Sequence, residues 1–119
     1  MRFDTVRFGK PAMIRAAKRL NEASGYLDLG LTQRAVACLD GLGDPGPFAV
    51  AVEVLRGEVA RREQRFGDAA DSLEAAARLL PSPSNKTLWL AVSHYHRQAG
   101  NLDHAIETLA NARGALPRE

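Results

Sequence analysis

Residues 30–47 of the chain read GLTQRAVACLDGLGDPGP, and their pattern returns as QRFGDAADSLEAAARLLP in residues 64–81 and as GNLDHAIETLANARGALP in residues 100–117. The repeated positions are Ala35, Leu39 and Pro47, then Ala69, Leu73 and Pro81, then Ala105, Leu109 and Pro117. The spacing is 34 residues and then 36, because the second connecting loop is two residues longer. A fixed period of this size is the sequence signature of stacked structural repeats. The repeat therefore decides the fold class.

The sequence between these positions predicts helices. Ala is abundant, and β-branched residues are too scattered for several alternating strands. Breaks by Gly and Pro, together with capping residues, divide the chain into six helices. The expected helices run from Pro11 to about Leu29, from near Thr32 to Gly41, from Pro47 to about Gln64, from Asp68 to before Pro81, from Ser84 or Asn85 to Gly100, and from Asn101 to about Gly114, with Thr32, Asp68 and Asn101 as N-caps.

The Ala and Leu positions have a physical role in such a repeat. A methyl group at Ala35, Ala69 and Ala105 lets two helix axes approach within about 8–10 Å. A Leu follows four residues later on the same face. One helix pair cannot bury its apolar stripe alone, so at least three pairs must stack. The chain has this minimum number of pairs.

The pattern resembles the tetratricopeptide repeat, a helix pair with an aromatic residue in its first helix, a Gly-type turn, Ala, a bulky residue and Ala in its second helix, and a closing Pro. The matching residues are Tyr26, Gly30, Ala35, Leu39 and Pro47 in the first repeat; Gly57, Phe66, Ala69, Leu73, Ala76 and Pro81 in the second; and Trp89, Gly100, Ala105, Leu109, Ala112 and Pro117 in the third. The residues that depart from the family pattern are Arg19, Glu22, Glu53 and Arg56 at apolar positions and Gln64 at the turn Gly.

The resemblance implies an all-α fold, a right-handed α-solenoid of three helical hairpins. The repeats would span about 16–49, 50–83 and 86–119, within a domain over 11–119 that follows a basic arm at 1–10. The first twenty residues contain six basic side chains and one acidic side chain, a net charge of +5. The rest of the chain carries −3, so the net charge of the whole chain is +2. We expect a solvated basic arm rather than an organelle transit peptide, and no apolar core follows it as a secretory signal requires.

Composition excludes several other classes of protein. The 119 residues are 45% apolar and 25% charged, as in an ordinary folded domain. Charged residues interrupt every apolar stretch, so we expect no membrane span. Cys38 is the single cysteine, which excludes an intrachain disulfide and a multi-cysteine metal site. A reducing, cytoplasmic setting follows from this.

Two features of the sequence resemble functional motifs, but a structural role explains each of them better. Residues 41–46, GLGDPG, match G-x-G-x-x-G, but they follow a helix instead of a strand and Pro45 stiffens them, so we expect a turn and no dinucleotide. The histidines at 94, 96 and 104 lack a completing Cys or HExxH. We expect His96 to be a packed, hydrogen-bonded core residue, His94 to lie in the groove, His104 to face solvent and Cys38 to be half-buried. No nucleophile has a base and an orienting group, so we expect no enzyme, metal or cofactor.

Function in the resembling family is usually peptide binding in the concave groove of the first helices. Carrying over its spacing, the groove residues are Ala17, Leu20, Ser24, Leu27 and Asp28; Ala51, Val54, Glu58, Arg61 and Arg62; and Thr87, Leu90, His94, Arg97 and Gln98. We hypothesise a protein partner with an apolar anchor near Leu20, Leu27 and Val54, and an acidic or carboxylate group near the arginines, which can pair bidentately. A solvated charged face without a ligand explains the pattern equally well. Leu20 and Ser24 replace the Lys and Asn of the family's chaperone carboxylate clamp, so chaperone tails are not expected.

Other functions rest on other surfaces. The alternative to groove binding is a small oligomerising adaptor, scaffold or secretion-type chaperone that acts through its end faces and Met1–Gly9. The last helix presents Ile106 and Ala110 to whatever lies beyond it, and repeat arrays need capping. Nucleic acid ranks below protein as a partner, because the body is net acidic and the aromatic residues stand at core spacings.

Overall fold

The structure, a computed structural model, describes residues 9–114, so nearly all of the expected basic arm and Pro117 lie outside the described residues. Within the described range the regular structure is helical, without strands, as predicted. The elements are α2 (Lys10–Asp28), α3 (Thr32–Asp40), the 3₁₀ turn η1 (Gly46–Phe48), α4 (Ala49–Arg62), α5 (Phe66–Arg78), α6 (Lys86–Gln98) and α7 (Leu102–Gly114). The six expected α-helices are therefore present.

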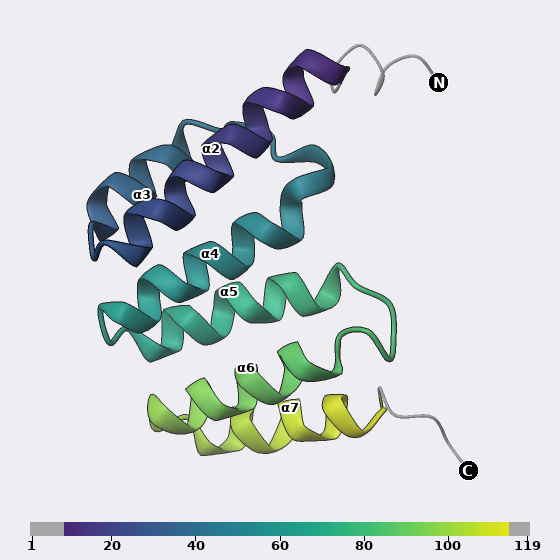
Figure 1. Cartoon of the computed structure of the whole chain (residues 1–119). Helices are drawn as coiled ribbons and strands as arrows, with labels where there is room; N and C mark the ends of the chain where they lie inside the picture. Colours follow the sequence, from purple (N-terminus) through teal and green to yellow (C-terminus); the bar gives the residue numbers. More distant parts are fainter. Residues whose placement is uncertain (1–8, 115–119) are drawn as a thin grey trace.

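Helices that follow one another in the chain lie side by side (Figure 1). Turns of three residues join α2 to α3, α4 to α5 and α6 to α7. Extensive packing also joins α5 to α6, whereas α4 meets α2 and α3 over smaller areas. The molecule is a slab of 42 × 37 × 18 Å. Each helix thus depends mainly on its neighbours in sequence.

The three short turns share one backbone conformation. Gly30, Gln64 and Gly100 have φ values of 76°, 60° and 84°, the left-handed region. In each turn the next N–H donates to the carbonyl five residues back, with an N···O distance of 2.8 Å. This is the closing hydrogen bond of a helix C-terminus with a left-handed residue. The turns therefore repeat at the same 34- and 36-residue spacing as the sequence.

Two of the expected helix caps are wrong. The N-cap positions of α3 and α5 are Leu31 and Arg65, and neither makes a side-chain cap hydrogen bond. Asp68 lies inside the first turn of α5, where its Oδ2 is 2.6 Å from Arg65 NH1. A carboxylate there also interacts favourably with the helix dipole.

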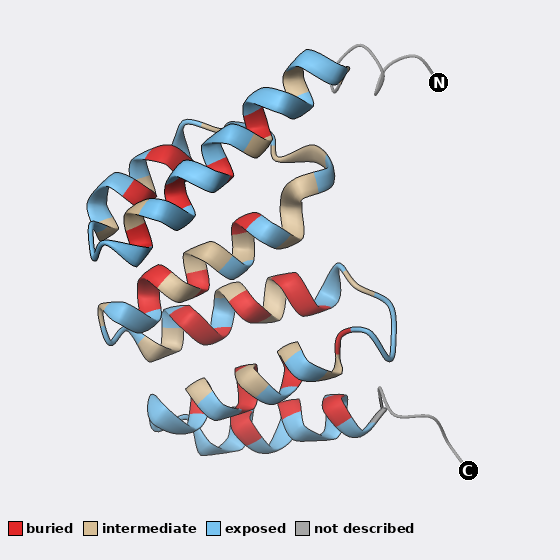
Figure 2. Ribbon diagram, in the orientation of Figure 1, coloured by how far each residue is buried: buried red, intermediate tan, exposed pale blue. Residues whose placement is uncertain are grey.

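The three small residues of the repeat pattern, Ala35, Ala69 and Ala105, are buried. Every α-helix carries buried residues (Figure 2). A Cβ added to Gly57 of α4 would lie 3.1 Å from Leu73 Cδ2 on α5, so these helices approach closely. Of the three leucines of the repeat pattern, Leu39 and Leu73 are buried, whereas Leu109 is 44% exposed. No described residue covers that side of α7.

The core consists of two clusters along the chain. The first joins α2, α3 and α4, and the second joins α5, α6 and α7 around Trp89 and Val92. The charged residues that depart from the repeat pattern are not buried: Arg19 and Glu22 are exposed, and Glu53 and Arg56 are half-buried. Arg56 on α4 donates to Asp40 Oδ1 at 3.0 Å. The core is thus a series of helix–helix interfaces.

Candidate functional site

Exposed side chains follow one face of α4 and one face of α6 at spacings of three and four residues. We name these residues the α4–α6 row: Ala51, Val54, Glu58, Arg61, Arg62, Thr87, Leu90, His94, Arg97 and Gln98. All of them are exposed except Glu58, which is half-buried. Both helices pack against α5. Val54 and Leu90 supply its large apolar side chains.

The prediction that Leu20 and Leu27 anchor a partner is wrong. Both are buried in the first core cluster, Leu27 with an exposed fraction of 2%. The buried stripe of α2 includes these two residues and Ala23, and it packs in the cluster with Ala35 and Leu39 of α3. On α2 only Ser24 and Asp28 of the expected groove residues are exposed. The expected site therefore contracts to α4 and α6.

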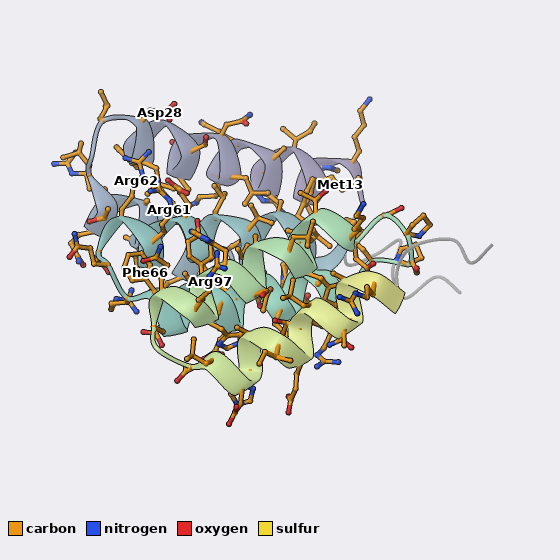
Figure 3. All side chains as sticks on the ribbon, turned by 90° about the horizontal axis from the view of Figure 1, so that it is seen from below. Met13, Asp28, Arg61, Arg62, Phe66 and Arg97 are labelled. Carbon is orange, nitrogen blue, oxygen red and sulfur yellow. The ribbon has the colours of Figure 1, made fainter. Side chains whose placement is uncertain are left out.

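Three arginines gather at the C-terminal ends of α4 and α6. Arg61, Arg62 and Arg97 lie at the same end of the molecule as Phe66, away from Met13 (Figure 3). The Glu58 carboxylate accepts hydrogen bonds from Arg61 Nε at 3.0 Å and Arg62 Nε at 2.8 Å. Two of the three positive charges thus share one negative charge.

These contacts change the acidity of both partners. Hydrogen bonding from Arg61 lowers the pKa of Glu58, partial burial opposes the shift, and Arg62 adds to the lowering. The same hydrogen bond raises the pKa of Arg61, with a smaller contribution from nearby Tyr95. Glu58 is therefore ionised at neutral pH and holds both guanidinium groups in place.

Arg97 is in a different situation, because it forms no ion pair with any described residue and is exposed. Two residues that precede Arg97 on α6, His94 and Tyr95, make contacts between rings. Tyr95 stacks on Phe66 of α5 with ring centroids 6.2 Å apart, and His94 meets Tyr95 edge to face at 5.2 Å. The sequence does not predict this contact, because Phe66 and Tyr95 share no helix and no repeat position.

A hollow of about 600 Å³ adjoins the arginines. Its lining residues are Gly30, Thr32, Arg61, Arg62, Glu63, Gln64 and Phe66. Gly30 and Thr32 come from the turn after α2 and the start of α3, and the other residues come from the end of α4, the turn after it and the start of α5. The hollow therefore lies between consecutive helix pairs. A carboxylate entering it would meet two guanidinium groups.

His96 is buried as predicted, but the expectation of a hydrogen bond is wrong. Neither ring nitrogen has a hydrogen-bond partner among residues 9–114, and Glu74 Oε1 is 3.9 Å from Nε2. The ring stacks on His104 with centroids 5.2 Å apart, while His104 faces solvent as expected. Cys38 is buried rather than half-buried. Among the residues described, no three potential metal ligands gather.

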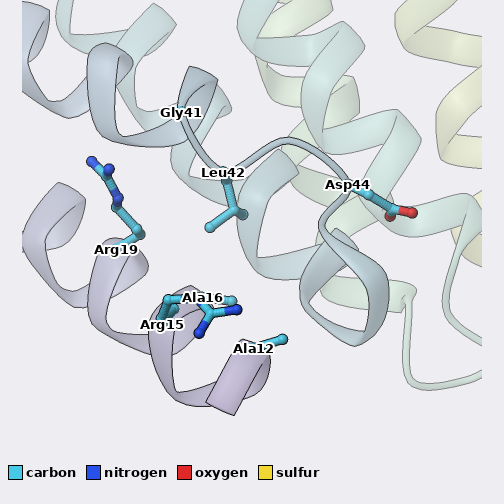
Figure 4. A pocket seen from close by; sticks show the side chains of 7 residues that line it. All are labelled: Ala12, Arg15, Ala16, Arg19, Gly41, Leu42 and Asp44. Atoms are coloured by element: carbon cyan, nitrogen blue, oxygen red, sulfur yellow. The ribbon is translucent and has the colours of Figure 1, made fainter. Parts of the chain in front are cut away.

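A second hollow of about 400 Å³ lies between α2 and the Gly-rich segment at 41–46. Its lining residues are Ala12, Arg15, Ala16, Arg19, Gly41, Leu42 and Asp44 (Figure 4). The segment follows α3 and begins as its C-cap, so the prediction of a turn is confirmed. The sequence signal for this basic hollow was the pair Arg15 and Arg19, one helical turn apart.

None of the helices between residues 9 and 114 combines the length and apolar character needed to cross a membrane. In a comparison with known proteins, no family model, no curated protein and no solved structure matches the chain.

Proposed function

We propose that the chain is a right-handed solenoid of three tetratricopeptide-like hairpins and acts as a non-catalytic protein-interaction module. Support for the solenoid comes from the three turns with one hydrogen-bond pattern, repeated at the spacing of the sequence repeat. The buried Ala at the same place in each pair adds to this support.

The observation that carries the binding proposal is the α4–α6 row. A surface that alternates apolar and cationic side chains at helical spacing suits an extended or helical peptide. Val54 and Leu90 offer apolar contacts, and Arg97 offers an exposed guanidinium that forms no ion pair with any residue between 9 and 114. The partner segment would therefore carry an apolar side chain and an acidic group or a terminal carboxylate.

Charge reversal in the row tests this function. We expect Arg61→Glu combined with Arg97→Glu to weaken binding of a captured partner segment by more than about tenfold, since it replaces attraction by repulsion. Partners are captured with the tagged full chain, identified by mass spectrometry, and their binding segments measured as synthetic peptides. Lys18→Glu combined with Arg34→Glu is the matched control, because both are exposed, lie outside the row and change the charge equally. Equal loss in the control, or none in the row variant, contradicts the proposal.

Glu58 provides a test in the opposite direction. Replacing it by Gln removes the negative charge that Arg61 and Arg62 share. We expect Glu58→Gln to bind an acidic peptide several-fold more tightly, because two full positive charges then face the ligand. The measurement is a peptide titration at low and high salt, and Glu53→Gln on the same helix is the control. Unchanged affinity in Glu58→Gln would show that the ligand does not approach these arginines.

A further inference from the structure

The outer face of α7 carries three large apolar side chains that are open to solvent. Leu102, Ile106 and Leu109 are 58%, 66% and 44% exposed. Their spacing of four and three residues places them on one helix face. Arg113, four residues beyond Leu109, continues the row and is also exposed. No described residue covers this face.

The internal repeat shows what this face does elsewhere in the chain. Thirty-six residues earlier, the same positions on α5 are Phe66, Ala70, Leu73 and Ala77. There, Ala70, Leu73 and Ala77 pack in one cluster with Trp89 and Val92 of α6, and Phe66 stacks on Tyr95. The corresponding Val36 and Leu39 of α3 pack in the cluster that contains Val52 and Val59 of α4. The faces of α3 and α5 that correspond to the exposed face of α7 therefore each pack against the next helix of the chain.

A copy of α2 does not suit the face on α7. The positions of α2 that correspond to Trp89 and Val92 of α6 are Arg19 and Glu22, seventy residues earlier. Both are exposed and charged, so head-to-tail stacking of two chains would bury them against leucine and isoleucine. Burying a charge without a partner is costly. The polar first face and the apolar last face of the molecule therefore do not match.

The face of α7 does match itself. In an antiparallel pair centred on these residues, Ile106 would lie opposite Leu109 of the partner subunit, and the reverse. Arg113, in the last turn, would then lie opposite Leu102 of the partner subunit and next to Asp103 of the partner subunit, in its first turn, and symmetry would make two such pairs. Apolar contact and charge complementarity thus arise together from one sequence.

We propose that α7 forms the interface of a two-fold symmetric dimer, with a second copy of this chain as the occupant of its apolar face. A two-fold interface uses the same patch on both subunits. The contact consists of one helix from each chain, so it buries less than a standard interface and the dimer is concentration-dependent. The α4–α6 row takes no part in the contact, so dimerisation and peptide binding fail independently.

Sedimentation equilibrium over a range of concentrations tests the interface. We expect the full chain to dimerise with rising concentration and Ile106→Glu to raise the dissociation constant by more than about tenfold. Ile14→Glu on α2 is the matched control, because Ile14 is 58% exposed and lies outside α7. Circular dichroism shows whether each variant keeps its helices. A monomeric wild type at all concentrations up to about 1 mM, or equal dimerisation of Ile106→Glu, overturns the proposal.

Reversing the charges tests the antiparallel arrangement. We expect Asp103→Arg or Arg113→Asp alone to weaken the dimer about three- to tenfold, because like charges then meet twice. The double variant restores the pairs and should dimerise like the wild type. A double variant as weak as the two single ones overturns the antiparallel pairing.

Discussion

Ala69 lies at the crossing of α4 and α5, where there is room for little more than its methyl group. It is fully buried, and its carbonyl oxygen lies 3.6 Å from where a Cβ on Gly57 would stand. We expect Ala69→Leu to lower the free energy of unfolding by about 1–3 kcal/mol, because extra carbons force the helices apart. Thermal and urea unfolding measure this. Ala37→Leu, at an exposed position of α3, is the control, and an unchanged melting temperature in Ala69→Leu would contradict the crossing.

His96 is buried without a hydrogen bond to either ring nitrogen. An unsatisfied buried polar group is costly, whereas an apolar ring of similar shape carries no such cost. We expect His96→Phe to raise the free energy of unfolding by about 1 kcal/mol. Glu74 keeps a partner in that variant, because its Oε2 also accepts from Arg78 at 2.6 Å.

Chemical unfolding at neutral pH measures the effect of His96→Phe. His104→Phe is the matched control, since His104 is largely exposed and its replacement should change stability little. A clear loss of stability in His96→Phe would mean that the imidazole makes a polar contact in solution.

At the scale of elements, the three short turns share a positive φ, although one of them has a residue type that disfavours it. Gly30 and Gly100 reach positive φ without a Cβ to strain, but Gln64 adopts φ 60° with a full side chain. The left-handed conformation costs a non-glycine residue about 1–2 kcal/mol. Glycine avoids this strain, but it loses more conformational entropy on folding, which offsets part of the gain. The turn after α4 is therefore the strained one.

Exchanging the turn residues tests this strain. We expect Gln64→Gly to stabilise the protein by several tenths of a kcal/mol and Gly100→Ala to destabilise it by about 1 kcal/mol. No atom lies within 4 Å of a Cβ added at Gly100, so backbone strain alone drives the loss. The midpoints of urea unfolding give both values. The same sign of change in both variants would contradict a shared turn conformation.

The helix starts show a limit of sequence reasoning at this scale. Thr32 and Asp68 are good capping residues, yet both lie within the first turn of their helices. The repeated turn fixes the chain just before each helix, through the hydrogen bonds from Leu31 and Arg65 to the preceding helix. Tertiary pairing of the helices thus overrides the local capping preference.

For the whole molecule, the weakest junction lies between the first helix pair and the rest. α4 meets α2 and α3 over smaller areas than those joining α4, α5 and α6. In a protein of neighbouring helix contacts, each region's stability follows its own interfaces. We expect central amides of α2 and α3 to exchange with deuterium faster than those of α5 and α6. Mass-spectrometric hydrogen exchange measures this, and equal protection of all four helices would show a single cooperative unit.

The helical class, the six helices, the three short turns and the Ala positions that are buried can all be predicted from the sequence. These depend on local propensity, on residues that permit a turn and on a repeat that is visible in one chain. They need no knowledge of which helix lies beside which. Gln64 shows that even an unfavourable residue at the turn does not change the result.

Which apolar residues are exposed at the surface depends on how the helices pack. Leu20 and Leu27 hold groove positions by spacing but are buried, whereas Leu109 holds a core position and is exposed. The fold also sets the charge pairing: Glu58 accepts hydrogen bonds from Arg61 and Arg62, whereas Arg97 forms no ion pair within the part of the chain that the structure describes. The physical reason is that burial and charge pairing depend on neighbours distant in sequence, which one helix's periodicity does not specify.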